Sequence, residues 1–152
     1  MTEDEKYIKR CIQLSEESFK NGDNPFGCLI ANKDGILVEA TNEATLDTTC
    51  HAEISAMRKA ELLLSSSNLS KYTIYSNCEP CPMCAFMMRE FKFKKVVFAI
   101  PSIWMGGYSK WNILQDKDLI KFKPIFSNPP EVVIGVLEKE AREIFKKANW
   151  TI

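Results

Sequence analysis

The hydrophobic and polar positions of this chain alternate between two periods. Apolar side chains recur at helical spacing up to about Lys20, from about Cys50 to Leu64, over 81–91 and over 138–149. Strand-like patterns cover residues 26–41, 72–76, 94–100 and 131–137. The turn signal NKDG divides the first of these segments into two strands. Strands that alternate with helices predict an α/β fold, so we expect a three-layer α-β-α sandwich with a central five-stranded sheet.

Local signals mark where two of the helices begin. Thr2 and Glu5 have the spacing of a capping box at the start of the first helix. Pro82 favours the first position of a helix, which makes Cys81 the N-cap of the third helix.

Length and charge narrow the class of protein. The 152 residues suit one domain, and we expect residues 1–152 to form it. The 20 basic and 20 acidic residues cancel, whereas proteins that grip a nucleic-acid backbone usually have a basic surface. No apolar run approaches the roughly 20 residues of a membrane span, and the charged start MTEDEKYIKR is unlike a secretory signal. We therefore expect a cytoplasmic protein without a membrane partner.

The chain holds six cysteines and a single histidine. Clustered thiols in a chain of this size that lacks a secretory signal bind metal or do chemistry more often than they form disulfides. Cys11 and Cys28 lie on apolar faces of predicted elements, and we expect both in the core.

The segments HAE (51–53) and EPCPMC (79–84) carry the candidate chemistry. Cys81 and Cys84 are three residues apart, so both sulfurs share one helix face and can reach one ion. With His51 they make three ligands, the number that a catalytic zinc uses when it keeps a fourth position for water. Glu53 follows the start of the predicted helix, where side chains can converge, and is the candidate base. A closed structural zinc that adds Cys78 as a fourth ligand is the alternative.

The order H-A-E followed by P-C-x-x-C resembles the signature of the zinc-dependent cytidine deaminase superfamily. The segments NPFGCLIANKDG, HAEISAMRKA and IYSNCEPCPMCAFMM are similar to the branch of guanine deaminases, fungal cytosine deaminases and tRNA adenosine deaminases. The resemblance implies a mixed sheet, one Zn²⁺ per chain on His51, Cys81 and Cys84, and a homodimer. It also implies hydrolytic deamination, in which water activated by zinc attacks the amine-bearing ring carbon, Glu53 shuttles the protons and ammonia leaves.

Five residues are candidates for substrate contact. The resemblance implies Asn42, because such families place a base-contacting asparagine before the HAE helix, and we add Ala52 of the motif itself. Phe26 could stack on a base or pack in the core. Trp104 and Trp111 flank Gly106 and Gly107, so they could wall a pocket or belong to the core or a dimer interface.

Three further residues have a structural and a functional interpretation. Glu79 and Pro80 are expected to form the turn between a strand and a helix, with substrate contact as the alternative for Glu79. Trp150 either caps a pocket or anchors the last helix.

We expect a zinc-dependent aminohydrolase that acts on a free nucleobase or nucleoside, most similar to the guanine deaminases of purine metabolism. A tRNA adenosine deaminase is the main alternative because its core motifs are nearly the same, although the balanced charge disfavours tRNA as a partner. A non-catalytic module stabilised by zinc is the third possibility.

Overall fold

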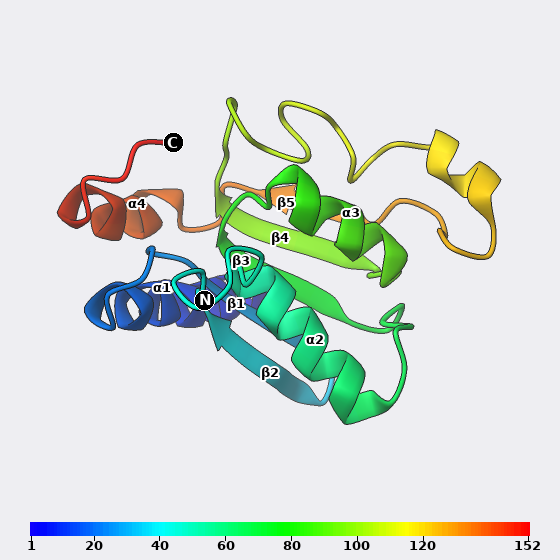
Figure 1. Ribbon diagram of the computed structural model, residues 1–152, viewed down its shortest axis with the longest axis horizontal. Coiled ribbons are helices and arrows are strands. Elements are labelled where there is room, and N and C mark those ends of the chain that lie inside the picture. The colour runs from blue at the N-terminus through cyan, green and yellow to red at the C-terminus, as the bar shows by residue number, and fades with distance from the viewer.

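A five-stranded mixed sheet forms the middle layer of the protein (Figure 1). The computed structural model describes all residues, Met1–Ile152. The strands are β1 (Gly27–Asn32), β2 (Gly35–Thr41), β3 (Thr73–Cys78), β4 (Lys95–Ile100) and β5 (Glu131–Ile134). Their order in the sheet is β2-β1-β3-β4-β5. β1 pairs antiparallel with β2 and β3, whereas β3, β4 and β5 are parallel.

Two pairs of helices cover the sheet on opposite faces (Figure 1). The helices are α1 (Glu3–Lys20), α2 (Ala52–Leu64), α3 (Pro82–Glu90), α4 (Glu138–Lys147) and the 3₁₀ helix η1 (Asp118–Phe122). The pair α2 and α3 packs on one face of the sheet, and α1 packs with α4 on the other. This arrangement confirms the predicted three-layer sandwich.

Alternate residues of each strand supply the two cores, as the period of a strand requires. In β1, Ile30 packs under α2 and α3, and its neighbour Leu29 packs under α1 and α4. Cys28 and Cys11 are fully buried in these two cores, as predicted.

The capping box predicted at the start of α1 is present. The backbone N–H of Glu5 donates to Thr2 Oγ1 at 3.1 Å, and the backbone N–H of Thr2 donates to Glu5 Oε2 at 2.8 Å. The two bonds satisfy donors that the first turn of a helix leaves open.

The last strand is shorter than its hydrophobic run predicts. The run extends over 131–137, but β5 ends at Ile134. Gly135 and Leu137 both have positive φ, so the backbone leaves the extended conformation and turns into α4. β3 is longer than predicted and ends at Cys78 instead of residue 76.

The long connection between β4 and β5 is held by Arg89 of α3, which is 2% exposed. Its Nη1 donates to the carbonyl oxygens of Ile113 at 2.8 Å and Asp116 at 2.7 Å, and its Nη2 donates to that of Ser127 at 3.3 Å. One buried guanidinium thereby fixes both sides of the loop that contains η1, an element that the sequence did not predict.

No helix combines the length and the apolar character that crossing a membrane requires.

Candidate active site and metal centre

The starts of α2 and α3 meet near the end of β3, and the residues before them are His51 and Cys81. Both residues are N-caps with non-helical backbone angles, and neither side chain makes a capping hydrogen bond. N-cap positions usually hold Ser, Thr, Asp or Asn, whose side chains bind the free N–H groups of the first turn. The imidazole and the thiol at these positions are therefore free to bind a ligand beside two positive helix ends.

Three ligand atoms form a compact triangle between these helix starts. His51 Nδ1 lies 3.5 Å from the Sγ atoms of Cys81 and of Cys84, and the two sulfurs are 3.6 Å apart. A tetrahedral zinc with bonds of about 2.3 Å to sulfur and about 2.0 Å to nitrogen separates such atoms by roughly 3.5–3.8 Å. The donor set and its spacing therefore fit one Zn²⁺.

The charge state of Cys81 also suits a cation. Hydrogen bonds between its thiol group and Cys84, and between it and His51, lower the pKa of Cys81 to about 4. The contact with Cys81 in turn raises the pKa of His51. The thiolate is the form of cysteine that binds metal.

Glu53 lies beside the triangle and is 5% exposed. Its Oε1 accepts a hydrogen bond from Ser76 Oγ at 2.9 Å, and its Oε2 lies 3.7 Å from Cys84 Sγ. Burial raises the pKa of Glu53, so its carboxylate holds a proton more readily than an exposed one. A base that must take up and release a proton near neutral pH benefits from such a shift.

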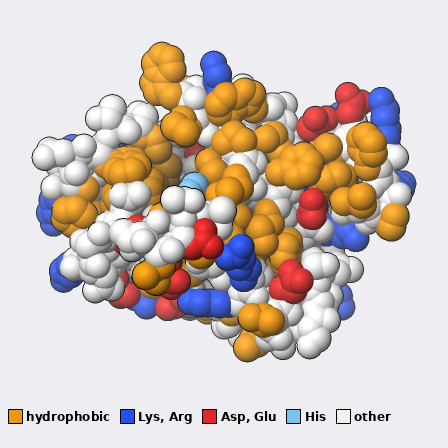
Figure 2. Space-filling model, in the orientation of Figure 1, with side chains coloured by type: hydrophobic (Ala, Val, Ile, Leu, Met, Phe, Trp, Pro, Cys, Tyr) orange, Lys and Arg blue, Asp and Glu red, His pale blue; other side chains and the backbone are white.

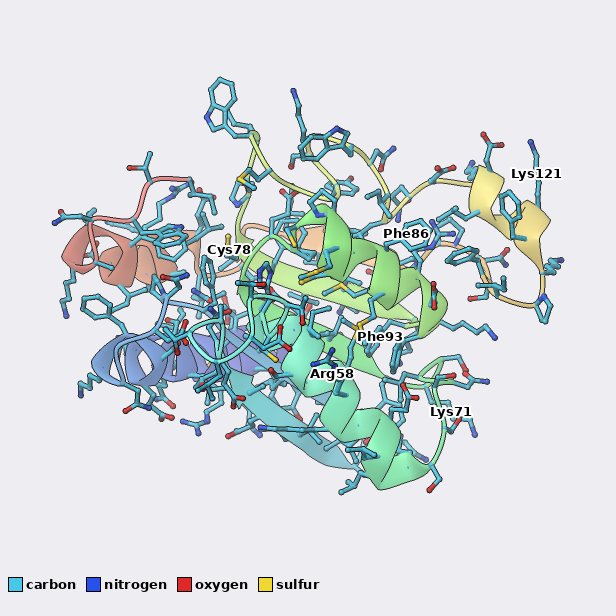
Figure 3. The ribbon with its side chains drawn as sticks, in the orientation of Figure 1. Arg58, Lys71, Cys78, Phe86, Phe93 and Lys121 are labelled. Atoms are coloured by element: carbon cyan, nitrogen blue, oxygen red, sulfur yellow. The ribbon has the colours of Figure 1, made fainter.

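Cys78 does not join the ligand triangle, although it lies nearby at the end of β3 (Figure 3). The group of clustered ligand atoms contains His51, Cys81 and Cys84. This geometry disfavours the closed four-ligand zinc.

A cavity of about 300 Å³ opens in front of the triangle. Figure 2 shows a small part of the imidazole among hydrophobic side chains. Six of the predicted site residues line this cavity, namely Phe26, Asn42, His51, Glu53, Cys81 and Trp104. Cys84 is buried behind them. Ala52 and Trp111 are not among the lining residues: Ala52 is fully buried, and Trp111 is 53% exposed.

Two residues with an open interpretation also line the cavity. Trp150 packs edge-on against Phe26, with ring centroids 5.3 Å apart, so the same ring anchors the end of the chain and forms part of a wall. Glu79 lines the cavity too, but its carboxylate is occupied by hydrogen bonds within the protein.

The loop 102–109 folds around Glu79. The carboxylate accepts hydrogen bonds from the backbone N–H groups of Ser102 (3.0 Å), Tyr108 (3.2 Å) and Ser109 (2.9 Å), and from Ser109 Oγ (2.6 Å). A Cβ atom on Gly106 would collide with this carboxylate. Glu79 lies between β3 and α3, as expected, but its carboxylate holds the loop that carries Trp104, a role that the sequence did not predict.

Five further residues that the sequence did not indicate also line the cavity, namely Asn24, Ser102, Met105, Thr151 and Ile152. They lie in loops and at the C-terminal end, where no periodic pattern fixes the direction of a side chain. The hydroxyl of Ser76, which binds Glu53, was missed for a different reason: Ser76 lies in β3 and its polarity is visible in the sequence, but its partner lies 23 residues away.

Comparison with known proteins connects this site to a family. Residues 1–100 match the zinc-binding region of cytidine and deoxycytidylate deaminases. The chain is 37% identical over 98 residues to the guanine deaminase of Bacillus subtilis (strain 168). The matched segment covers 62% of this chain and 63% of that protein. The match thus spans less than two thirds of the relative's length.

Two other relatives match over more of the chain. The chain is 33% identical over 144 residues to the tRNA-specific adenosine deaminase of Bacillus subtilis (strain 168), covering 92% of this chain and 84% of that protein. The fold is similar to that of a guanine deaminase from Nitrosomonas europaea, with a TM-score of 0.80 and 19% identity over 99% of this chain and 87% of the other. At that identity the likeness speaks for the fold alone.

Proposed function

This chain belongs to the cytidine and deoxycytidylate deaminase zinc-binding family, whose members are zinc-dependent hydrolytic deaminases, and we propose that its substrate is a free nucleobase or nucleoside, with guanine foremost. The observation that carries this choice is the cavity. It measures about 300 Å³, and the last residues of the same chain, Trp150, Thr151 and Ile152, form part of its wall. That volume is at the small end of the range for ligand pockets, about 300–1,000 Å³, and suits a single base, while the wall formed by the last residues favours a free base over a base within a polymer.

The walls suit a flat, partly polar ring. Phe26, Trp104 and Trp150 offer aromatic surfaces, and Asn42 offers a carboxamide. Aromatic faces bury a base without demanding a particular hydrogen-bond pattern, so the polar groups select which base fits.

We assign His51, Cys81 and Cys84 as the ligands of one zinc ion and Glu53 as the general acid and base. Zinc, when bound, lowers the pKa of a water molecule to about 7 and so provides the nucleophile. Glu53 would take a proton from the water as the water oxygen forms a bond to the amine-bearing ring carbon, and would deliver that proton to the amine nitrogen, so that the carbon–nitrogen bond breaks and ammonia leaves. Ser76 holds Oε1 of Glu53, which leaves Oε2, near Cys84, for the proton.

A tRNA adenosine deaminase is the second candidate, because the match to the tRNA-specific adenosine deaminase of Bacillus subtilis covers 92% of this chain. Against it stands the zero net charge, since phosphate contacts normally require an excess of Lys and Arg.

We also propose that the protein forms a homodimer, as the resemblance implies. Met83 and Phe86 of α3 are 39% and 42% exposed (Phe86 is labelled in Figure 3), and Phe122 and Ile125 of the connection between β4 and β5 are exposed as well. An exposed apolar surface of this kind is more often part of a protein–protein interface than left facing the solvent. Sedimentation of the protein measures the oligomeric state directly.

Ammonia release from guanine, cytosine, adenine, guanosine and cytidine tests the proposed function. We expect release from guanine by the zinc-loaded protein, and none by Glu53→Gln, which should keep its zinc. No release from any of the five compounds contradicts the proposal. Release only from adenosine in tRNA, with a salt-sensitive complex in electrophoresis, identifies the second candidate.

A further inference from the structure

The side chain of Asn42 in the cavity wall is held from behind by Asp23, which does not line the cavity. Asp23 lies in the turn between α1 and β1, and its Oδ1 accepts a hydrogen bond from Asn42 Nδ2 at 2.9 Å. On the other side, Asn42 Oδ1 accepts from the backbone N–H of Ala52 at 3.1 Å. We propose that Asp23 is a positioning residue that fixes the orientation of the Asn42 carboxamide toward the substrate, an inference that rests on the proposed function.

The two partners of Asn42 permit a single orientation of its carboxamide. The oxygen and nitrogen of a carboxamide have nearly the same shape, so a half-turn exchanges donor and acceptor at little steric cost. A carboxylate only accepts hydrogen bonds, and a backbone N–H only donates. Asn42 must therefore turn Nδ2 to Asp23 and Oδ1 to Ala52.

Asp23 stays ionised at neutral pH, which this arrangement requires. Partial burial pushes the pKa of Asp23 upward, but hydrogen bonds from Asn42, Asn24 and Thr45 outweigh burial and lower it overall. A protonated Asp23 could donate as well as accept and would no longer dictate the orientation of the carboxamide.

A carboxamide with a fixed orientation presents its donor and its acceptor to the substrate at fixed positions. Asn42 is 4% exposed, and its hydrogen bonds within the protein leave one N–H hydrogen and one oxygen lone pair unused. A base that presents an acceptor opposite the remaining N–H binds well, and one that presents a donor there leaves both groups unpaired. Mismatches of this kind cost far more than a missing methylene does.

The second oxygen of Asp23 has a separate task. Oδ2 accepts from the backbone N–H of Thr45 at 3.2 Å and from Thr45 Oγ1 at 3.0 Å, which ties down the loop between β2 and α2. Anchoring of this loop is therefore the competing explanation for any effect of Asp23. Thr45→Val removes the hydroxyl bond to Oδ2 and leaves the bond between Oδ1 and Asn42 in place, so it separates the two tasks.

The test compares kcat and KM of zinc-loaded variants on the base that the wild type deaminates fastest. We expect Asp23→Asn to raise KM by about tenfold, because the amide of an asparagine can donate as well as accept and therefore no longer dictates the orientation of the Asn42 carboxamide. Thr45→Val and the exposed control Asp34→Asn should stay within about twofold of the wild type. In a background of Asn42→Ala, Asp23→Asn should change KM no further, because its effect passes through Asn42.

Three kinetic results overturn the proposal. In the first, the effects of Asp23→Asn and Asn42→Ala multiply in the double variant. In the second, Asp23→Asn alone leaves KM unchanged. In the third, Thr45→Val reproduces the full effect of Asp23→Asn, which assigns Asp23 to the loop.

Hydrogen exchange of the Ala52 amide gives a readout that needs no substrate. This N–H donates to Asn42 Oδ1, so its exchange should speed up in Asp23→Asn and in Asn42→Ala but not in Thr45→Val. If no base is deaminated, the proposed function fails, and faster exchange in Asp23→Asn still supports the link from Asp23 to Asn42. Unchanged Ala52 exchange in Asp23→Asn overturns that link whatever the substrate is.

Discussion

Replacing Glu79 by Gln perturbs the loop that walls the cavity while it keeps the size of the side chain. In the protein, Oε1 accepts from the backbone N–H of Ser102 and from Ser109 Oγ, and Oε2 accepts from the backbone N–H groups of Tyr108 and Ser109. A glutamine must place an NH₂ group at one of these positions, facing groups that donate. The Oε1 position is the less costly one, because the Ser109 hydroxyl can turn and accept.

The expected cost follows from this arrangement. The backbone N–H of Ser102 is left without an acceptor in a buried place, which costs about 1–3 kcal/mol. The remaining hydrogen bonds lose the charge of the carboxylate, which costs about 1 kcal/mol more. We therefore expect Glu79→Gln to lower the free energy of unfolding by about 2–4 kcal/mol.

Urea unfolding of the zinc-loaded protein, followed by tryptophan fluorescence, measures this change. Glu16→Gln is the matched control, because Glu16 is exposed on α1, and it should lie within about 0.5 kcal/mol of the wild type. Trp104 and Met105 lie in the same loop, so KM for the base should also rise in Glu79→Gln. A stability equal to that of Glu16→Gln refutes the view that Glu79 organises this loop.

Three further predictions concern residues outside the ligand triangle. Ser76→Ala should lower kcat by roughly 10–100-fold with zinc content unchanged, because Glu53 loses the bond that orients it; an unchanged kcat in steady-state assays would show that the bond is dispensable. Arg89→Met should lower the free energy of unfolding by about 3–5 kcal/mol and make the loop that Arg89 binds accessible to proteases, because three partly buried carbonyl groups lose their donor; equal cleavage in both proteins contradicts this. Hydrogen bonds from Arg10 lower the pKa of Glu39 below its ordinary value of 4.5, so this carboxylate stabilises the fold above pH 4.5 and loses that contribution as pH falls through its lowered pKa. Glu39→Gln should flatten acid unfolding in that range, and an unaltered pH profile argues against the pair.

The grouping of the candidate metal ligands was predictable because the sequence marks the helix starts that present them. Pro82 places Cys81 at an N-cap, and Cys84 follows one turn later. His51 takes the equivalent position before α2, so two local signals were enough to bring three side chains together. That zinc occupies this group stays a prediction.

The surroundings of the site were less predictable because they depend on contacts between distant segments. The bond from Asn42 to Asp23 joins residues 19 positions apart, and the bond from Ser109 to Glu79 joins residues 30 apart. Periodicity says nothing about such pairs. Trp104 and Trp111 looked alike in the sequence, yet Trp104 lines the cavity and Trp111 does not, since the loop geometry decides where each ring points.

The extent of the last strand of the sheet was also not fully predictable from the hydrophobic pattern. The hydrophobic pattern alone extended the last strand to Leu137. In the structure the backbone turns at Gly135, directly after the last strand residue, Ile134. The glycine was the visible signal, and its positive φ outweighed the apolar run around it.

Anomalous diffraction at the zinc edge, from crystals of the zinc-loaded protein, tests the metal centre most directly. We expect one peak about 2.3 Å from the sulfurs of Cys81 and Cys84 and about 2.0 Å from Nδ1 of His51. Its fourth position should carry no protein atom and should face Glu53. A map without a peak in this triangle, or with the sulfur of Cys78 in the fourth position, contradicts an open catalytic zinc.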